Sequence, residues 1–268
     1  MLDEKSSTSP KISIGIVVFN GVEHIKRALD SVIGQPYKNI ELIVMDGGST
    51  DGTQNVLNEY AEHFSVLVSE SDKGIYDAMN KVCSLANGDW LIFLGCDDIL
   101  VDTLGTIAGK MTNSEAVYYG DTIFSSTGAI FGGKFSKYRL MQHNICHQAM
   151  FYPRHAYKNN SYDLNYEWLA DYEYNIRLLG KAYPFVYLAE IVSIFNDKGG
   201  SSLGDVVFEK KKLQLIRESF GIPYVLLEIA KRIGDRTAVM SGTILKRILP
   251  NQFWQFVQSV WRNLRNRY

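Results

Sequence analysis

Cysteine is scarce in this chain of 268 residues. Its three cysteines, Cys83, Cys96 and Cys146, are widely spaced and contain no CxxC pair. A disulfide framework needs paired cysteines and a structural zinc site needs clustered ligands, so the sequence favours neither. A reducing cytosol is the simpler environment for such a chain, and Cys96 fits a buried, inert thiol.

Long apolar runs are also missing. No stretch reaches the roughly 18 apolar residues of a membrane span, and the nearest, residues 222–230, contains Glu228. The first ten residues are polar and lack the apolar segment of a secretory signal peptide, which predicts a flexible arm over residues 1–10. If the protein meets a membrane, we expect it to lie on the surface.

Two nucleotide-binding motifs and an excess of positive charge are absent as well. No GxxxxGK[ST] loop occurs and no GxGxxG follows the first apolar run, which excludes the usual nucleoside triphosphate and dinucleotide fingerprints. The net charge of -1 argues against a general nucleic-acid-binding protein. Residues 1–204 hold 16 basic and 24 acidic residues, whereas residues 205–268 hold 12 and 5, so the two parts are expected to meet different partners.

The chain does have a regular alternation of strand and helix patterns. Apolar, β-branched runs of strand length occupy residues 12–18, 40–45, 66–68 and 90–94, and apolar positions at helical spacing lie between them. This alternation predicts an α/β fold whose mostly parallel sheet is covered by helices on both faces. Ligands of such folds bind beyond the carboxyl ends of the strands, so polar residues there are candidate site residues.

The pattern changes twice further along the chain. After about residue 110 it becomes less regular and rich in aromatic residues, and the segment GGSSLG at residues 199–204 precedes a helical pattern that begins near Asp205. We therefore expect one α/β domain over residues 11–204, followed by a basic, amphipathic helical extension over residues 205–268.

Acidic residues stand at the ends of two predicted strands and before a later amphipathic helix. They belong to a set of segments spread in order over roughly residues 11–202: SIGIVVFN, ELIVMDGGSTDGT, SESDKGIYDAMNK, NGDWLIFLGCDD, ICHQAMFYP, LADYEYNIRLLGKAYPFVYL and KGGSS. By these segments the sequence resembles the family 2 inverting glycosyltransferases with the GT-A fold. It is similar to the subgroup that builds bacterial O-antigen and colanic-acid-type exopolysaccharides.

The resemblance implies a metal-dependent hexosyltransferase. Its donor would be a nucleotide sugar, in this family usually a UDP-sugar, and its acceptor a hydroxyl of a lipid-linked oligosaccharide. It would use Mg²⁺ or Mn²⁺, invert the anomeric configuration, and work in the cytoplasm at the inner face of the bacterial cell membrane.

Asp98 is the metal ligand that the resemblance implies, and Asp97 would face the ribose or the metal shell. The chemistry agrees, because a hard divalent cation stabilises the charge that develops on a departing diphosphate. Taken alone, Asp98 also fits the N-cap of a helix beginning at Ile99, since aspartate is a favoured cap.

Three residues are expected around the donor base by the same resemblance. Asp46 would accept a hydrogen bond from the base, Phe19 would pack along it, and Asp72 is a second candidate for the same pocket. Asp46 lies in a glycine-rich segment and also fits a turn-forming aspartate, and the two roles are compatible.

Inversion needs a base on the face of the sugar opposite the leaving diphosphate. The resemblance assigns this role to Asp171, with Glu173 or Glu167 next, while an isolated aspartate here would read as a solvated helix cap. Asp171 and Glu173 are not expected to point the same way on a helix. His147 is a candidate contact of the acceptor, the diphosphate or the metal, or else a structural histidine.

Two other functions remain as alternatives. A nucleotidyltransferase also uses strand-end aspartates with a divalent ion, but its glycine-rich basic phosphate loop is poorly matched by FNGVEHIKR. A non-catalytic carbohydrate-binding protein on a degenerate transferase fold would have lost metal or base residues, whereas Asp98 and Asp171 are both present.

The end of the chain carries an amphipathic pattern without acidic residues. From Lys246 onward its basic and apolar residues are Lys246, Arg247, Arg262, Arg265 and Arg267, and Phe253, Trp254, Phe256, Val257, Val260, Trp261 and Leu264. This composition predicts docking on an anionic membrane surface. The alternative is that the segment packs on the catalytic domain or on a second subunit.

Overall fold

A computed structural model describes residues 9–197, 204–236 and 255 of the chain. The chain divides into two units, one ending at Lys210 and the other beginning at Lys211, each of which is described by itself. The predicted boundary between Gly204 and Asp205 lies a few residues earlier. Most of the predicted N-terminal arm and the basic amphipathic segment from Lys246, apart from Gln255, lie outside the described residues.

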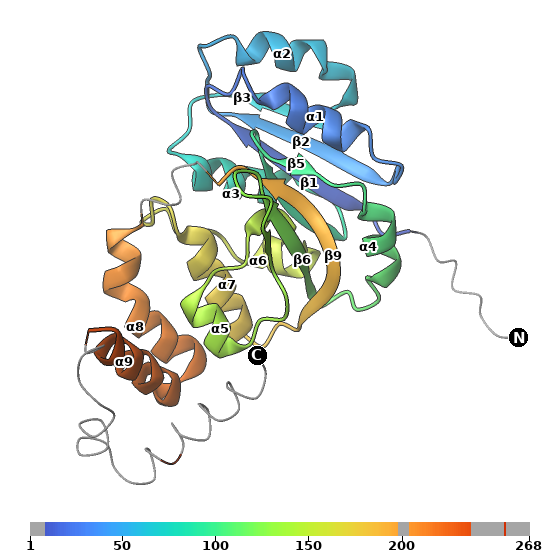
Figure 1. Cartoon of the computed structure of the whole chain (residues 1–268). Helices are drawn as coiled ribbons and strands as arrows, with labels where there is room; N and C mark the ends of the chain where they lie inside the picture. Colours follow the sequence, from blue (N-terminus) through green and yellow to red (C-terminus); the bar gives the residue numbers. More distant parts are fainter. Residues whose placement is uncertain (1–8, 198–203, 237–254, 256–268) are drawn as a thin grey trace, which may run out of the picture. The chain divides into compact units, whose positions relative to one another are not determined.

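The first unit begins with alternating strands and helices (Figure 1). Its elements up to residue 110 are β1 (Ile12–Val18), α1 (Ile25–Ile33), β2 (Ile40–Asp46), α2 (Thr53–Glu59), the 3₁₀ helix η1 (Ala61–His63), β3 (Val66–Ser69), α3 (Ile75–Leu85), β4 (Trp90–Gly95), β5 (Ile99–Leu100) and α4 (Leu104–Lys110). The four strands predicted from their apolar runs are confirmed.

The less patterned part of the chain contributes shorter elements and one long strand. These are β6 (Val117–Phe124), β7 (Ile130–Phe131), α5 (Lys137–Gln142), η2 (His147–Ala149), β8 (Met150–Pro153), α6 (Arg154–Asn159), α7 (Ala170–Gly180) and β9 (Phe185–Phe195). Two further helices follow, α8 (Val206–Phe220) and α9 (Ile222–Arg236).

Within the described residues the strands form one nine-stranded sheet. Its order is β3-β2-β1-β4-β8-β6-β9-β5, and β7 pairs with β6. The first four strands of this order are parallel, as predicted. The other half is mixed, because β8 runs antiparallel to both β4 and β6 while β9 is parallel to β6.

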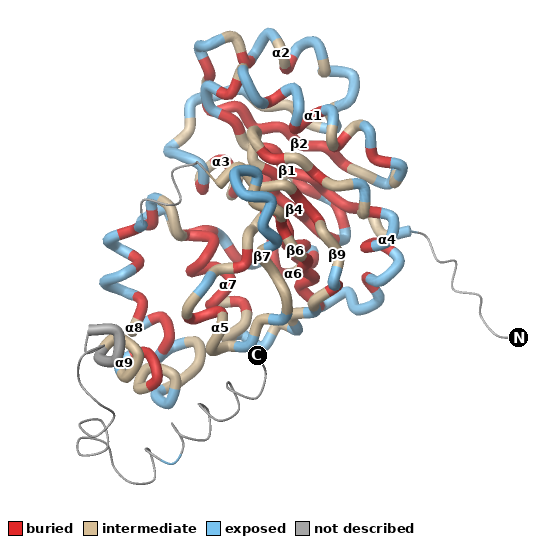
Figure 2. The backbone as a smooth tube through the Cα atoms, in the orientation of Figure 1, coloured by how far each residue is buried: buried red, intermediate tan, exposed pale blue. Residues whose placement is uncertain are grey.

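Helices cover both faces of the parallel half. The side chains of Ile12, Ile14 and Ile16 in β1 are fully buried and join one core cluster with the apolar face of α1. Gly15 faces the opposite side, where an added Cβ would lie 2.6 Å from Val82 Cγ1 of α3. This close approach of α3 to the sheet requires glycine, and Figure 2 shows the buried strands among more exposed helices.

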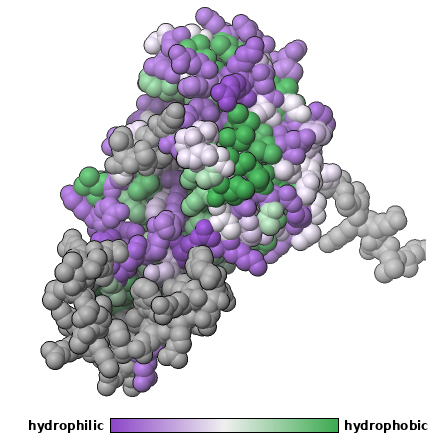
Figure 3. All heavy atoms as spheres, viewed as in Figure 1, coloured by the Kyte–Doolittle hydropathy of each residue, from purple (hydrophilic) through white to green (hydrophobic). Residues whose placement is uncertain are grey.

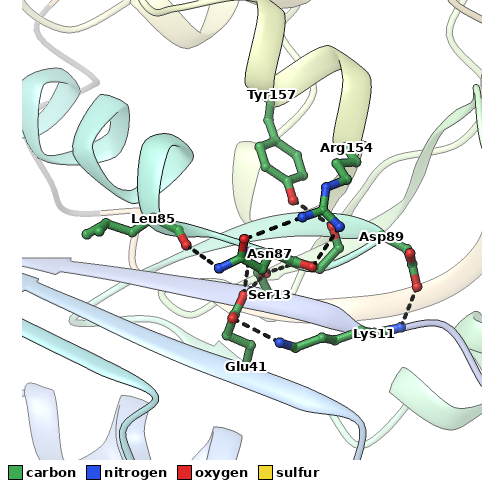
Figure 4. A network of polar contacts seen from close by, with 9 residues as sticks. Lys11, Ser13, Glu41, Leu85, Asn87, Asp89, Arg154 and Tyr157 are labelled. Carbon is green, nitrogen blue, oxygen red and sulfur yellow. Dashed lines mark hydrogen bonds and ion pairs between the residues drawn. The ribbon is translucent and has the colours of Figure 1, made fainter.

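A buried carboxylate lies at the amino ends of the parallel strands and accepts several hydrogen bonds (Figure 4). Glu41 in β2 accepts hydrogen bonds from Lys11 Nζ at 2.9 Å, from Ser13 Oγ and from the backbone N–H of Asn87 at 2.7 Å. Burial alone would raise the pKa of Glu41, but these hydrogen bonds and the charge of Lys11 outweigh it and hold the pKa below its usual value. Each oxygen of this carboxylate therefore has partners within the protein.

The edge of the sheet opposite β3 is formed by the two-residue strand β5. Ile99 of β5 pairs with Ile194 of β9, and both side chains are half-buried. Figure 3 shows apolar side chains gathered over β5 and β9 on the face in view. Such a short edge strand offers few unpaired backbone groups to other chains.

The second unit contains the later part of α8 and α9. Gly221 joins the two helices with a φ of 88°, the left-handed conformation that glycine supplies at helix ends. Glu228 of α9 is paired with Lys212 of α8 at 3.4 Å and with Arg232 at 3.0 Å. No helix in the part of the chain that the structure describes is long and apolar enough to cross a membrane.

Candidate active site

A cavity of about 820 Å³ opens at the carboxyl ends of the parallel strands. Phe19, Gly47 and Asp97 line it where β1, β2 and β4 end. The segment Leu164–Trp168 and His147 also line it. The position is the one that the strand pattern predicted, and the volume suits a ligand of nucleotide-sugar size.

Phe19 presents an aromatic ring at this cavity, with 64% of its surface exposed. The turn after it is fixed by Asn20, whose φ of 50° lies in the left-handed region that asparagine tolerates. The Asn20 amide donates to Ser49 Oγ at 2.7 Å, and Asn20 Oδ1 accepts from the Thr50 amide at 2.9 Å. The backbone after Phe19 is thus tied to the loop after β2, and the exposed ring offers a surface on which a flat ligand could stack.

Asp46 and Asp72 occupy different depths. Asp46 is fully buried, and its carboxylate accepts hydrogen bonds from Ser49, Ser69 and Gln54. Asp72 lines the cavity, and its Oδ2 is 2.7 Å from where a Cβ on Gly47 would be. Glycine at position 47 therefore gives Asp72 room at the cavity wall, while Asp46 fixes the turn beneath it.

Asp97 and Asp98 follow β4 and are both held by Asn196, which follows β9. The Asn196 amide donates to Asp98 Oδ1 and its Nδ2 to Asp97 Oδ2, each at 2.8 Å. The Gly95 amide donates to Asp98 Oδ2 at 3.2 Å. Asp98 is not a helix N-cap, because the next residues form β5; this alternative is wrong.

Asp98 carries a strongly perturbed carboxyl group. Its side chain is 2% exposed, and burial, with a smaller contribution from the charge of Asp97, raises its pKa to about 6 against the hydrogen bonds from Asn196 and Gly95 and the charge of His147. Burial and the same two carboxylates raise the pKa of Cys96 to about 12, so this thiol stays protonated, as expected of an inert cysteine. The end of β4 is therefore a site of poorly compensated negative charge.

Asp171 lies in the first turn of α7 and is 6% exposed. Tyr76 OH lies 3.0 Å from its Oδ1, and Asn144 Nδ2 donates to its Oδ2 at 2.6 Å. Burial, followed by the charge of Asp171, raises the pKa of Tyr76 well above its usual value, so the phenol keeps its proton. The alternative of a solvated cap is wrong, because the carboxylate is enclosed by donors.

His147 begins η2 and is paired with Asp171. Its Nδ1 lies 3.5 Å from Asp171 Oδ2, and its side chain also lines the cavity. Burial alone would lower its pKa, but the hydrogen bond and charge of Asp171 and the charges of Asp98 and Asp97 outweigh it and raise the pKa. The carboxylates around this imidazole therefore favour its protonated form over that of a free histidine.

The two other acidic candidates near α7 lie differently. Glu173 is buried and paired with Arg177, with Nε to Oε1 at 2.8 Å and Nη2 to Oε2 at 3.1 Å. Glu167 is exposed and lines the cavity. Glu173 and Asp171 thus have separate partners, as the helical spacing predicted.

Four of the predicted site residues line the cavity, and the other three are buried and do not line it. Phe19, Asp72, Asp97 and His147 line it, while Asp46, Asp98 and Asp171 are buried. Sequence reasoning missed Tyr76, Asn144 and Asn196. Asn196 is polar and directly follows a strand, which is a usable signal, whereas Tyr76 lies on the apolar face of α3 and gives none.

Comparison with known proteins assigns a family to this arrangement. Residues 13–166 match the model of Glycosyl transferase family 2. A PGL/p-HBAD biosynthesis glycosyltransferase of Mycobacterium bovis BCG is 36% identical over 88% of this chain and 97% of its own length. An uncharacterized glycosyltransferase of Mycobacterium tuberculosis is 30% identical over 64% of this chain and 70% of its own.

Two solved structures share the fold at low sequence identity. S. aureus TarS 1–349 in complex with UDP-GlcNAc is 16% identical with a TM-score of 0.66, covering 84% of this chain and 73% of that one. The mannosyltransferase PcManGT of Pyrobaculum calidifontis, in complex with GDP-Man and Mn2+, is 14% identical with a TM-score of 0.60, covering 98% and 89%. The predicted GT-A fold is therefore confirmed.

The raised pKa of Asp98 makes its effect on stability depend on pH. The folded chain holds this proton more tightly than the unfolded chain. The contribution of Asp98 to stability therefore falls as the pH rises from about 4 to about 6. In metal-free protein with EDTA, we expect the unfolding midpoint of Asp98→Asn relative to wild type to rise by about 2–4 °C between pH 5 and pH 8. This corresponds to roughly 1 kcal/mol, and thermal unfolding at the two pH values measures it.

The change with pH is the readout because it reports the ionisation of Asp98 separately from those costs of the substitution that do not depend on pH. Asp102→Asn is the matched control, since Asp102 is exposed and its charge is hydrated in both states. A difference between Asp98→Asn and wild type that stays constant from pH 5 to pH 8 would contradict the assignment.

Proposed function

The chain belongs to glycosyl transferase family 2, and on this premise we propose that it transfers a sugar from a nucleoside diphosphate donor to an acceptor hydroxyl with inversion. The observation that supports this most is the cavity at the strand ends. Its lining includes an aromatic ring and carboxylates, at Phe19, Asp72 and Asp97, together with His147, whose Nδ1 lies 3.5 Å from the buried Asp171. The first set suits a nucleotide sugar, and the second suits removal of a proton.

The donor is a UDP-sugar in this proposal. The ring of Phe19 stacks on the base. The hydrogen bond from the base, predicted first for Asp46, is assigned here to Asp72, because Asp72 lines the cavity and Asp46 is fully buried. UDP-GlcNAc bound to TarS and GDP-Man bound to PcManGT support a nucleotide-sugar donor for the fold. A nucleotidyltransferase is disfavoured by the family assignment.

Asp98 and Asp97 would hold Mg²⁺ or Mn²⁺. Within the described residues no group of three or more acidic, histidine or cysteine side chains forms a complete metal cage. Two adjacent carboxylates nevertheless fit Mg²⁺, which is usually bound through one or two carboxylates together with substrate phosphates and water. When bound, the ion stabilises the negative charge on the leaving diphosphate.

Asp171 is the proposed base. As the acceptor oxygen bonds to the anomeric carbon, the bond to the diphosphate breaks and the hydroxyl proton passes to Asp171. Tyr76 and Asn144 fix the carboxylate, and His147, which contacts both Asp171 and the cavity, positions it. A non-catalytic carbohydrate-binding protein would not need this buried assembly.

We further propose that the acceptor is a lipid-linked saccharide of bacterial surface polysaccharide biosynthesis, at the cytoplasmic face of the inner membrane. This rests on the sequence resemblance to O-antigen and exopolysaccharide enzymes and on the basic, tryptophan-containing segment from Lys246. That segment lies outside the described residues apart from Gln255, so the argument is one of composition.

Asp98→Ala tests the metal site. We expect the affinity for UDP in the presence of Mn²⁺ to fall at least about tenfold, to the value measured with EDTA, because a cation that offset the charge of the diphosphate would lose its ligand. Isothermal calorimetry measures this, and Asp102→Ala is the control for loss of an exposed carboxylate nearby. Unchanged affinity in Asp98→Ala would remove Asp98 from the metal site.

Asp171→Asn tests the base. We expect turnover to fall by at least about a hundredfold while UDP binding stays within twofold of wild type, because the amide cannot take up the proton. Glu173→Gln is the matched control, a carboxylate in the same helix turn that pairs with Arg177 instead.

Two results would count against this assignment of the base. One is wild-type turnover in Asp171→Asn. The other is a product whose anomeric configuration, read by NMR, is the same as that of the donor, because a base opposite the leaving group implies inversion.

Vesicle flotation tests the membrane proposal. We expect the full chain to float with anionic vesicles at low salt and a chain ending at Leu245 to stay behind, because each basic residue near an anionic surface contributes about 1 kcal/mol. Vesicles of phosphatidylcholine alone and added salt should both reduce flotation of the full chain. Equal flotation of the two chains would rule out the segment as a membrane anchor.

A further inference from the structure

Asp205 accepts hydrogen bonds from five backbone amides in two different segments. Its Oδ2 accepts from Glu167 at 2.8 Å, Trp168 at 3.1 Å and Leu169 at 3.4 Å. Its Oδ1 accepts from Val207 at 2.9 Å and Phe208 at 3.0 Å. One oxygen therefore caps α8, while the other holds a segment more than thirty residues earlier in the chain.

The earlier segment is part of the cavity wall. Leu164–Trp168 lines the cavity, and α7 begins two residues after Trp168 with Asp171 in its first turn. The Trp168 carbonyl also lies 2.7 Å from Tyr76 OH, the group that contacts Asp171. The backbone that Asp205 holds thus leads directly into the proposed base.

Aromatic side chains also connect α8 to the cavity wall and to the first turn of α7. The Phe208 ring is 1% exposed and stacks on Tyr172 of α7, with 4.8 Å between centroids and 24° between planes. It meets Tyr166 of the cavity wall edge-on at 6.1 Å. All of these residues lie within the first unit.

The carboxylate suits this role in its charged form. Asp205 is 7% exposed, and its burial alone would raise the pKa, but the amides of Phe208, Trp168, Leu169 and Glu167 outweigh burial and lower it. An anion that accepts several amide hydrogen bonds holds them more strongly than a neutral side chain would. A side chain with one acceptor oxygen could cap α8 and leave the wall amides without this partner.

We propose that Asp205 is a positioning residue for sugar transfer, which holds the Leu164–Trp168 wall and the first turn of α7 so that Asp171 meets the acceptor oxygen. The proposal rests on the function proposed above. It assigns to the start of α8 a role in the chemistry of the cavity, through the backbone of the wall rather than through contact with substrate. Donor binding, which uses Phe19, Asp72 and the carboxylates after β4, does not depend on it.

Asp205→Asn and Asp205→Ser separate the two halves of this contact. Both variants retain one side-chain oxygen that can cap α8, so each is expected to fold. Serine is too short to reach the wall amides as well. We expect hydrogen exchange at the amides of Glu167, Trp168 and Leu169 to become at least about tenfold faster. Release of UDP from a UDP-sugar with Mn²⁺, with water as the acceptor, should fall at least about tenfold in turnover number while UDP affinity stays within twofold.

Glu41→Gln is the matched control. Glu41 is also a buried carboxylate that accepts a hydrogen bond from a backbone amide. It belongs to the polar network of Figure 4, and none of the residues labelled there lines the cavity. The Glu41→Gln variant should lower the unfolding midpoint, as the Asp205 variants do, and leave the turnover number near that of wild type.

Three outcomes decide the matter. Normal exchange at residues 167–169 in both Asp205 variants would overturn the proposal, whatever the enzyme activity. Turnover no lower than in Glu41→Gln would overturn it as well, because Asp205 would then serve stability alone. If the wild type releases no nucleoside diphosphate from any UDP- or GDP-sugar, the function proposed above fails, and the exchange measurement still tests whether Asp205 holds the wall.

Discussion

The incompletely compensated negative charge after β4 is the constraint on which the rest of the site depends. Asp98 is almost fully buried with Asp97 beside it, and Asn196, the Gly95 amide and His147 offset this charge only in part, since the pKa of Asp98 remains raised to about 6. A buried carboxylate of this kind is costly unless a cation joins it. In the proposed reaction, the diphosphate of a nucleotide sugar would add further negative charge, and a divalent ion would compensate both.

The two ends of the parallel strands show how a buried carboxylate can serve stability or function. At the amino end, Glu41 has Lys11, Ser13 and the Asn87 amide around it, and its pKa is lowered. At the carboxyl end, Asp98 has only amide donors in direct contact, and its pKa is raised. A carboxyl pKa raised in this way beside a cavity is typical of functional sites, because burying such a group does not stabilise the fold.

The sequence predicted most of the parallel half of the sheet and the edge at which its ligand site lies. Continuous β-branched runs identify buried parallel strands, and Asp46, Asp97 and Asp98 follow from where two of these runs end. The reading of Asp98 as a helix cap was wrong because Ile99 and Leu100 pair with β9, a strand nearly one hundred residues away. Local patterns contain no record of such a partner.

The contacts that complete the site are missing from local patterns for the same reason. Asn196 and Asp98 are 98 residues apart, and Tyr76 and Asp171 are 95 residues apart. Asp205 read as the start of a helix, and only folding shows that its second oxygen holds the cavity wall. The position of Asp46 beneath the cavity likewise depends on Ser69 and Gln54, which no spacing rule connects to it.

The central claim is that this chain uses a divalent ion to break the bond between a sugar and a nucleoside diphosphate. The most direct test incubates the full chain with a panel of UDP- and GDP-sugars and measures release of the nucleoside diphosphate, once with Mn²⁺ and once with EDTA. The account predicts release from at least one donor with Mn²⁺ and none above background with EDTA. Equal release in EDTA, or no release from any donor with Mn²⁺, would contradict it.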